Sequence, residues 1–514
     1  MGLRIAIRAD ASVLLGSGHV RRCLALIDHF IELDCDVTVF TRAAKGNMSD
    51  MLRCRGCTVH ELCVPLAIND DCDISDCSNK SEYDDAISTI SNARGAIYDW
   101  MIVDHYELSG IWEEATRDLY KHLLVFDDLA DRNHQCSILV DQNLGRDPSH
   151  YQGLLNTEAT CLCGPRYAAL RPEFPAARVE SLARARNRVG LNVLIFMGGT
   201  DPNNVTSQVL QSILDGHEHV FENLYVVMGS AAPSLSKVKD LIAKFTCRTE
   251  LVIDTDKIHE YMMVSDVAFG GAGGAAWERC CLGLPSLIVT IADNQLAGSR
   301  ALVREGAAKV LSPSELGEAG LAYKIQQWGE SRVLHDMSVK AANVCDGGGV
   351  SRILMEMCKV DKSLLAIRRA EAADESLLLS WANDPLTRKN AFNQEPISLQ
   401  QHTDWFGGKM KQVATCHIYI VSLPNGDDIG QVRFEKEHHQ WVIDYSMDAM
   451  FRGKGLGVSL LSRALSTLAE HHSNEQVVGH VKLSNLASTN IFIRCAFTKQ
   501  SENENGTVTF VRKI

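Results

Sequence analysis

The chain has 514 residues, of which 46% are hydrophobic and 22% charged, and its formal net charge at pH 7 is −13. This composition argues against a disordered or fibrous protein, and the length predicts about three domains. The negative charge disfavours nucleic-acid binding, and no apolar run reaches the ~18–20 residues that cross a bilayer. The 17 cysteines are not preceded by a recognisable signal peptide, which predicts free thiols and a cytoplasmic location.

The first domain is predicted over residues 1–165. Leu3–Ile7 is typical of a buried strand, a glycine-rich loop follows at Gly16–His19, a helical pattern runs to Phe30, and Val37–Phe40 is again strand-like. Strand, glycine loop, helix and strand make a βαβ unit. Further strands are expected at 101–103, 123–126 and 138–140, which predicts a parallel α/β domain.

The same pattern starts again in a second domain, predicted over residues 166–360. A strand at 192–196 leads into the turn Met197–Asp201, and a strand at 266–269 leads into Gly270–Gly274 and a helix at 275–282. Further strands are expected at 224–228, 250–253 and 287–289. The predicted fold class is therefore α/β, with two Rossmann-like domains in tandem.

A third domain, of mixed α+β type, is predicted over residues 361–514. The chain from Lys362 onward carries 17 basic and 16 acidic residues, a net charge of +1, so that the preceding residues carry −14. Strand patterns at 418–421, 429–434 and 441–445 precede a glycine-rich turn and a helix from Val458 to about Glu470. The change in charge and pattern supports a boundary near residue 360.

The first candidate site is the loop Gly16-Ser17-Gly18-His19. Glycines let a ligand approach the backbone, and amides at a helix N-terminus favour an anion, so Gly18 is a candidate substrate contact. A lone Gly-x-Gly is more often structural, but His19 would lie at the carboxyl edge of the sheet, where α/β proteins bind ligands. With an unperturbed pKa of ~6.5, this histidine suits a general base near neutral pH.

The second domain has two glycine loops that would meet at one edge of its sheet. The run Gly270–Gly274, after a strand and before a helix, is typical of a diphosphate cradle, and Glu278 in that helix could reach ribose hydroxyls. The alternative is close packing of helix on strand. The candidate substrate contacts in these loops are Gly199, Thr200, Asp201, Gly273, Gly274 and Glu278.

These loops together resemble the GT-B fold of nucleotide-sugar enzymes. More closely, residues 1–355 resemble the UDP-2,4-diacetamido-2,4,6-trideoxy-β-L-altropyranose hydrolases of pseudaminic acid biosynthesis. The resemblance is specific because separated motifs occur in order: Ile7–Ser12, Gly16–Arg22, Asp104–Tyr106, Asp127-Asp128, Asp141–Asn143, Met197–Asp201, Trp277–Cys280 and Asp293–Gln295.

The resemblance implies cleavage at the anomeric carbon, with release of UDP and the free sugar. His19 falls on the proposed base for water attack, and Glu278 falls on the carboxylate that GT-B relatives use for the ribose. Arg171 and Asn294 are further candidate substrate contacts. Displacement by one water predicts inversion, and no metal is required.

The third domain carries Arg452-Gly453-Lys454-Gly455-Leu456-Gly457 at the expected start of a helix. Arg-x-x-Gly-x-Gly at such a place offers backbone N–H groups and two cations to a pyrophosphate. With Asn485–Phe497 downstream, residues 365–514 resemble the GNAT N-acetyltransferases. The resemblance implies acetyl-CoA as co-substrate, its pyrophosphate on residues 452–457 and its pantetheine arm near Asn485.

Two positions depart from the GNAT pattern. Phe492 stands where many members have a tyrosine that protonates the thiolate, and Ala496 replaces the usual glycine. Either another acid such as Tyr445 acts, or the thiolate leaves without help, or the activity is lost. Candidate bases for the incoming amine are Glu435, His438 and His439, although the two histidines could form a solvated hairpin tip.

The spacing of Cys54, Cys57, His60 and Cys63 is zinc-like. However, residues 57–62 alternate as a strand, which would send neighbouring ligands to opposite faces, so no metal site is expected. The adjacent Cys280 and Cys281 are predicted to belong to the core.

The sequence predicts a bifunctional enzyme that acts on small molecules. One part would hydrolyse a UDP-linked diacetamido sugar, and the other would N-acetylate its 4-amino precursor with acetyl-CoA. Alternatives are a GT-B glycosyltransferase, a hydrolysing 2-epimerase, a GNAT domain that acts on another amine such as a protein N-terminus, and one that only binds acetyl-CoA. The oligomeric state stays open.

Overall fold

The computed structural model describes residues 3–13, 15–63, 78–184, 190–215, 221–289, 296–311, 325, 332–503 and 505–514. The chain divides into two compact units, Met1–Ile353 and Leu354–Ile514. Both Rossmann-like domains expected from the sequence lie in the first unit. The boundary between the units falls inside helix α14 (Gly349–Val360), a few residues before the predicted one.

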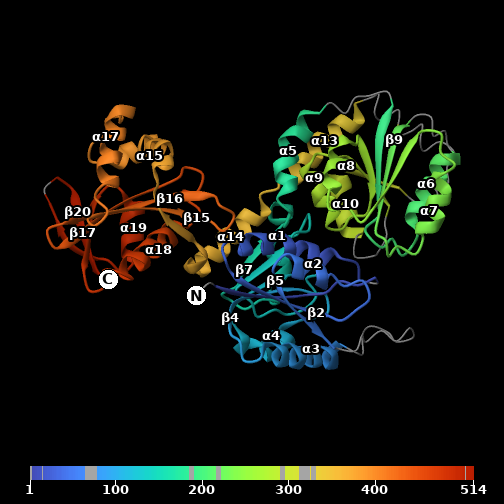
Figure 1. The fold of residues 1–514 in the computed structure, drawn as a ribbon, viewed down its shortest axis with the longest axis horizontal. Coiled ribbons are helices and arrows are strands. Elements are labelled where there is room, and N and C mark those ends of the chain that lie inside the picture. Colours follow the sequence, from blue (N-terminus) through green and yellow to red (C-terminus); the bar gives the residue numbers. More distant parts are fainter. Residues whose placement is uncertain are drawn as a thin grey trace. The chain divides into compact units, whose positions relative to one another are not determined.

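The first sheet of unit 1 is parallel, with strand order β3-β2-β1-β4-β5-β6-β7. Its strands are apolar because both faces are covered: Figure 1 shows helices α1 and α2 on one face and α3 and α4 on the other. The strand order reverses between β1 and β4, where such sheets leave a crevice at their carboxyl edge. The elements are β1 (Arg4–Ala9), α1 (Gly18–Glu32), β2 (Asp36–Arg42), α2 (Ser49–Cys54), β3 (Thr58–Leu62), α3 (Ser78–Ala93), β4 (Tyr98–Asp104), α4 (Gly110–Ala115), β5 (Tyr120–Phe126), β6 (Ile138–Asp141) and β7 (Thr160–Cys163).

The second sheet of unit 1 is also parallel, in the order β10-β9-β8-β11-β12-β13, and reverses between β8 and β11. The two glycine loops of the sequence follow these two strands, so both lie at the same edge of the sheet, as predicted. Cys280 and Cys281 are buried in its core, also as predicted. The elements are α5 (Glu173–Ala183), β8 (Leu191–Phe196), α6 (Val205–Asp215), β9 (Phe221–Met228), α7 (Leu235–Ile242), β10 (Arg248–Ile253), α8 (Ile258–Val264), β11 (Val267–Gly270), α9 (Ala275–Cys281), β12 (Ser286–Val289), α10 (Leu296–Arg304), β13 (Ala308–Leu311) and α13 (Val333–Val344).

Unit 2 has a mixed sheet in the order β14-β15-β16-β17-β18-β20-β19. Its neighbours are antiparallel except β17 and β18, which are parallel. The predicted helix after the glycine-rich turn is α18. The elements are β14 (Ala366–Arg369), α15 (Glu375–Ala382), α16 (Pro385–Asn390), α17 (Leu399–Met410), β15 (Cys416–Ser422), β16 (Asp428–Glu437), β17 (Gln440–Met447), α18 (Gly457–Ala469), β18 (Gln476–Lys482), α19 (Leu486–Arg494), β19 (Thr498–Glu502) and β20 (Thr507–Lys513).

Within the described ranges, no helix combines the length and apolarity needed to cross a membrane.

Candidate active sites

His19 lies at the point where the first sheet reverses its strand order. It is the second residue of α1, directly after the glycine loop that follows β1, and its side chain is half-buried. Its ring packs edge-on against Tyr106, with ring centroids 4.4 Å apart. Burial lowers the pKa of His19 below its ordinary 6.5, and the carboxylate of Asp104 opposes that shift in part. The imidazole is therefore neutral near pH 7, which is the state that a general base requires.

One turn further along α1, Arg22 joins three elements of the same edge. Its guanidinium donates to Asp104 at the end of β4, at 2.6 and 2.5 Å, and to Asp128 after β5, at 2.9 and 3.0 Å. Arg22 and Asp104 are buried, and the ion pair holds the pKa of Asp128 below its usual range. Removing one member of such a buried cluster costs about 3–5 kcal/mol, so the network holds the His19 turn against the other loops. The sequence motifs contain these residues, but their pairing was not predicted.

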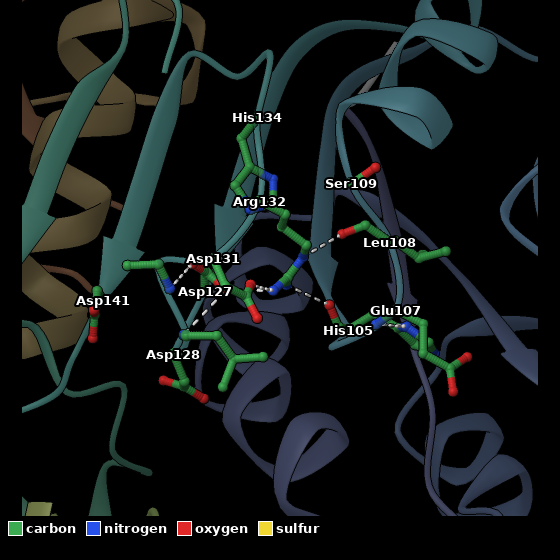
Figure 2. A network of polar contacts seen from close by, with 12 residues as sticks. His105, Glu107, Leu108, Ser109, Asp127, Asp128, Asp131, Arg132, His134 and Asp141 are labelled. Atoms are coloured by element: carbon green, nitrogen blue, oxygen red, sulfur yellow. Dashed lines mark hydrogen bonds and ion pairs between the residues drawn. The ribbon is translucent and has the colours of Figure 1, made fainter. Parts of the chain in front are cut away.

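Arg132 ties the loop after β4 to the loop after β5 (Figure 2). Its Nε donates to the carbonyl of Leu108 at 2.9 Å, its Nη2 donates to the carbonyl of His105 at 3.0 Å, and its Nη1 lies 3.0 Å from Asp127 Oδ1. The first loop carries Tyr106 and the second carries Asp128. Arg132 therefore holds together the two loops whose residues Tyr106 and Asp128 lie near His19.

A buried ionic cluster supports the end of β1. Asp10 accepts two hydrogen bonds from Arg8, at 2.5 and 2.9 Å, and one from the backbone of Arg42 at 2.7 Å. His105 Nε2 lies 3.0 Å from Asp10 Oδ2, and Thr41 Oγ1 and Arg42 Nε each lie 3.4 Å from an Asp10 carboxylate oxygen. The Arg8 guanidinium holds the pKa of Asp10 well below its usual range. The motif Ile7–Ser12, to which Arg8 and Asp10 belong, therefore has a structural role at the end of β1.

In the second sheet, the turn Met197–Asp201 is held by its neighbours. The two carboxylate oxygens of Asp201 accept from the backbone N–H groups of Val205 and Thr206, each at 2.9 Å, so Asp201 caps α6. The carbonyl of Gly199 accepts from Gly229 N at 2.8 Å, and a Cβ on Gly229 would lie 2.4 Å from that oxygen. Gly229, which the sequence did not single out, is required for this contact. Substrate binding by Gly199, Thr200 and Asp201 stays a prediction.

The Gly270–Gly274 loop packs against the buried guanidinium of Arg279. A Cβ on Gly270 would lie 2.5 Å from Nη1 of Arg279, which is almost fully buried in α9. Arg279 donates to Ser286 Oγ at 2.8 Å and to the carbonyl of Gly271 at 2.5 Å. The packing interpretation therefore holds for Gly270. Gly274 is exposed with open space at its Cβ position, so it is free to approach a ligand.

Glu278 and Arg171 lie near one another. Glu278 is half-buried, and burial raises its pKa while Arg171 and Arg21 oppose the shift. Arg171 is buried and donates to the carbonyl of Asp256 at 3.0 Å. Arg21, two residues after His19, has Nη1 3.8 Å from Asp256 Oδ1. Arg171 and Arg21, which belongs to helix α1 with His19, thus both lie near Asp256 and near Glu278. Asn294, the remaining candidate, lies outside the described residues.

Unit 2 contains a cavity of about 780 Å³ between two strands that separate. β17 and β18 pair from Gln440 only as far as Ile443, opposite Gly479, although both strands continue. Residues 444–447 and 480–482 therefore do not pair with one another and line the cavity, while they keep their pairing with β16 and β20. Of the predicted co-substrate residues, Arg452, Gly453, Gly455, Leu456, Gly457 and Asn485 line it, whereas Lys454 is exposed and does not.

The glycine-rich turn is anchored by Arg452. Its Nε donates to the carbonyl of Met447 at 2.9 Å, its Nη1 to Asp384 Oδ1 at 2.5 Å and its Nη2 to Thr387 Oγ1 at 3.0 Å. This differs from the expected free cation, because the guanidinium is neutralised within the protein. Gly453 and Gly455 have φ of 73° and 85°, a region that favours glycine. Pyrophosphate binding by this turn stays a prediction, with its backbone amides as the available donors.

Comparison with known protein families matches residues 365–498 to the acetyltransferase (GNAT) domain. The UDP-2,4-diacetamido-2,4,6-trideoxy-β-L-altropyranose hydrolase of Campylobacter jejuni is 24% identical over 305 residues, which cover 59% of this chain and 97% of that protein. The chain is a homologue of this hydrolase with a GNAT domain after it. We call residues 1–353 the hydrolase-like unit and residues 354–514 the GNAT unit.

Two further relatives were found. The uncharacterized protein MJ1062 of Methanocaldococcus jannaschii is 24% identical over 442 residues, 84% of this chain and 82% of that protein. Because the hydrolase-like unit ends at residue 353, this match extends into both units. The spore coat polysaccharide biosynthesis protein SpsG of Bacillus subtilis is 29% identical over 192 residues, 37% of this chain and 56% of that protein.

Solved structures are similar to parts of this chain. MurG of Acinetobacter baumannii covers 68% of this chain and 98% of its own, with 16% identity and a TM-score of 0.48. A spermidine N-acetyltransferase of Vibrio cholerae, solved with CoA and spermine, covers 30% of this chain and 95% of its own, with 19% identity and a TM-score of 0.26.

In the GNAT unit, Tyr445 supplies a hydroxyl inside the cavity. It donates to Ser488 Oγ at 2.9 Å, and Asn485 caps α19 by accepting from Ser488 N at 3.2 Å. Burial raises the pKa of Tyr445 to about 12, so its hydroxyl keeps its proton. Phe492 packs instead on Phe497 and Phe510, with ring centroids at 4.8 and 5.5 Å. Both residues line the cavity, and Tyr445 as the acid stays a prediction.

The three candidate bases lie outside the lining of the cavity, near the turn that joins β16 to β17. His438 and His439 form the exposed turn between β16 and β17, and Glu435 forms an ion pair with Lys409. None of the three lines the cavity, because the strands separate at the opposite end of β17. The acidic side chain among the residues that line the cavity is Asp444. It is the first residue of β17 beyond the part that pairs with β18.

Ala496, the second departure from the GNAT pattern, follows α19 with φ of 58°. This left-handed conformation costs a non-glycine residue roughly 1–2 kcal/mol, which explains why glycine is usual there. The substitution affects stability rather than the cavity, since Ala496 does not line it.

The zinc-like cysteines do not gather. Cys57 is buried and Cys54 exposed, and His60 stacks on Phe40 with ring centroids 5.4 Å apart. Over the described part of the chain, no three histidine, cysteine or acidic side chains form a group able to hold a metal ion.

Proposed function

We propose that the hydrolase-like unit cleaves a UDP-linked 2,4-diacetamido-2,4,6-trideoxy sugar into UDP and free sugar. The observation that carries the proposal is the half-buried His19 at the point where a parallel sheet reverses its strand order. Burial lowers the pKa of this histidine, and the chain is homologous to a UDP-2,4-diacetamido-2,4,6-trideoxy-β-L-altropyranose hydrolase. His19 takes a proton from water as the water oxygen attacks the anomeric carbon. The bond from that carbon to the diphosphate breaks, and its electron pair leaves with UDP.

UDP leaves readily once its diphosphate is bound, so a strong general acid is not needed. We propose the amides of the two glycine loops for the diphosphate and Glu278 for the ribose. Buried Arg279 adds positive charge beneath the second loop. The proposed substrate contacts are Gly18, Arg171, Gly199, Thr200, Asp201, Gly273, Gly274, Glu278 and Asn294.

Incubation with the UDP-linked diacetamido sugar tests this reaction. Proton NMR should show free sugar appearing with the anomeric configuration opposite to that of the substrate, because one water displaces UDP. Product that forms only after an acceptor sugar is added would instead identify a glycosyltransferase. Incorporation of deuterium at C2 in heavy water would identify a hydrolysing 2-epimerase.

For the GNAT unit we propose N-acetylation of the 4-amino precursor of the same sugar, with acetyl-CoA as donor. The amine nitrogen attacks the thioester carbonyl carbon, Asp444 takes a proton from the amine, and Tyr445 gives its hydroxyl proton to the departing thiolate. Both side chains line the cavity formed by the separated strands. Joining consecutive steps in one chain raises the local concentration of the intermediate.

A further inference from the structure

The wall of the acetyltransferase cavity carries an excess of positive charge. Its acidic side chain is Asp444, whereas its basic side chains are Arg388, Arg433, Arg452, Lys482 and Arg494. Arg452 belongs to the turn expected to take the pyrophosphate of acetyl-CoA, and Asp384 already neutralises it. The charges of Arg388, Arg433 and Lys482 come from three other elements, α16, β16 and β18.

Two of these cations are held by backbone carbonyls. Arg388 donates to Ala382 O at 2.5 Å and Asn393 O at 3.1 Å, and Lys482 donates to Ala391 O at 2.5 Å. Within the described part of the unit, neither forms an ion pair. A carbonyl positions a cation without cancelling its charge, so both charges remain available to a ligand in the cavity.

The third cation, Arg433, lies over an aromatic ring and forms a long ion pair with Asp444. Its guanidinium carbon lies 5.2 Å from the centre of the Trp405 ring, and its Nη2 lies 3.8 Å from Asp444 Oδ2, too far for a hydrogen bond. Stacking on an aromatic ring orients a guanidinium and leaves its N–H groups free for a phosphate. The N–H donors of Arg433 therefore lie beside Asp444, the carboxylate that we propose takes a proton from the acceptor amine.

We propose that Arg388, Arg433 and Lys482 form a subsite for a phosphate or diphosphate group on the acceptor, separate from the turn that takes acetyl-CoA. The proposal rests on the proposed acetylation and makes its acceptor class specific: an amine that carries its own phosphate. The excess of positive charge in the wall, left mainly by Arg388 and Lys482, attracts such a zwitterion and disfavours polyamines, which need acidic walls.

Initial rates of CoA thiol release by the full chain test the proposal, because that signal reports the GNAT unit alone. The acceptors are the UDP-linked 4-amino sugar, the same amino sugar without UDP, glucosamine 6-phosphate and spermidine. We expect kcat/KM to fall by about 100-fold when UDP is removed and to be lower still with spermidine. Arg433→Gln and Lys482→Gln should each raise the acceptor KM by about 10-fold, the loss of one charge-assisted hydrogen bond, with the acetyl-CoA KM unchanged.

Arg463→Gln is the matched control, since Arg463 also donates to a carbonyl, that of Leu365 at 3.0 Å, but does not line the cavity. An equal kcat/KM for the UDP-linked and the free amino sugar would overturn the subsite and leave the proposed acetylation standing. So would a wild-type acceptor KM in both Arg433→Gln and Lys482→Gln. Acetylation of glucosamine 6-phosphate but not of the UDP-linked sugar, with the same dependence on Arg433 and Lys482, would support the subsite and remove the proposed acceptor. Acetylation of spermidine alone, or of none of the four, would contradict both.

Discussion

His19→Ala is expected to lower the rate of UDP release by 10²–10⁴-fold, the usual contribution of a positioned general base. The imidazole lies at the reversal point of the first sheet and is uncharged at neutral pH because burial lowers its pKa. Alanine leaves the glycine loops unchanged, so UDP should bind with nearly the wild-type Kd. Release of UDP at saturating substrate and calorimetric titration with UDP measure the two effects.

His29→Ala is the matched control, because His29 lies on the same helix α1 but ten residues further along, beside Glu32. It should keep UDP release, and both variants should keep acetylation by the GNAT unit. UDP release at the wild-type rate by His19→Ala would remove this histidine from the mechanism.

The pH profile adds a second readout of the same base. A lowered pKa means that the folded protein protonates His19 only below its ordinary 6.5. The wild-type kcat/KM should therefore stay level through neutral pH and fall as the pH drops below 6.5, and this acid limb should disappear in His19→Ala. An acid limb with its midpoint above 6.5 would contradict the assignment.

Gly455→Glu is expected to raise the KM for acetyl-CoA by at least about 100-fold while UDP release is unchanged. Gly455 lines the cavity with φ of 85°, and a Cβ there would lie 3.3 Å from Lys359 Cε. The new side chain brings strain, bulk and a negative charge to amides that we propose for a pyrophosphate, and like charges in such a site repel. Thiol release at varied acetyl-CoA measures the effect.

Gly426→Glu separates the cavity effect from backbone strain. Gly426 has a similar φ of 84°, lies in the turn between β15 and β16 with open space around it, and does not line the cavity. Both variants share the strain of a left-handed non-glycine residue, so only Gly455→Glu should lose acetyl-CoA. Equal KM values for acetyl-CoA in the two variants would refute the turn as its site.

The strands and glycine turns could be predicted because their signals are local. An apolar run bounded by glycine fixes a buried strand, and the predicted strand 192–196 lies within β8 (Leu191–Phe196). Similarly, the helix expected from Val458 to about Glu470 is α18 (Gly457–Ala469). The place of His19 followed from the same logic, because a turn after a parallel strand lies at its carboxyl edge.

The pairings within the sites could not be predicted, because they depend on strand order and register. Arg22 meets Asp104 and Asp128 only because β4 and β5 lie beside β1 in that order. Arg452 is neutralised by Asp384, 68 residues away in the sequence. Asp444 is not among the bases predicted from the sequence, because nothing in the local sequence pattern shows where β17 and β18 stop pairing.

If one chain performs acetylation and then hydrolysis, both products should appear in a single reaction, and recording both is the most direct measurement. The full chain is given the UDP-linked 4-amino sugar and acetyl-CoA, and CoA thiol and UDP are recorded against time. We expect thiol release first, then UDP after a lag, in equal final amounts, and no UDP when acetyl-CoA is omitted. UDP release at the same rate without acetyl-CoA, or thiol release without any later UDP, would contradict it.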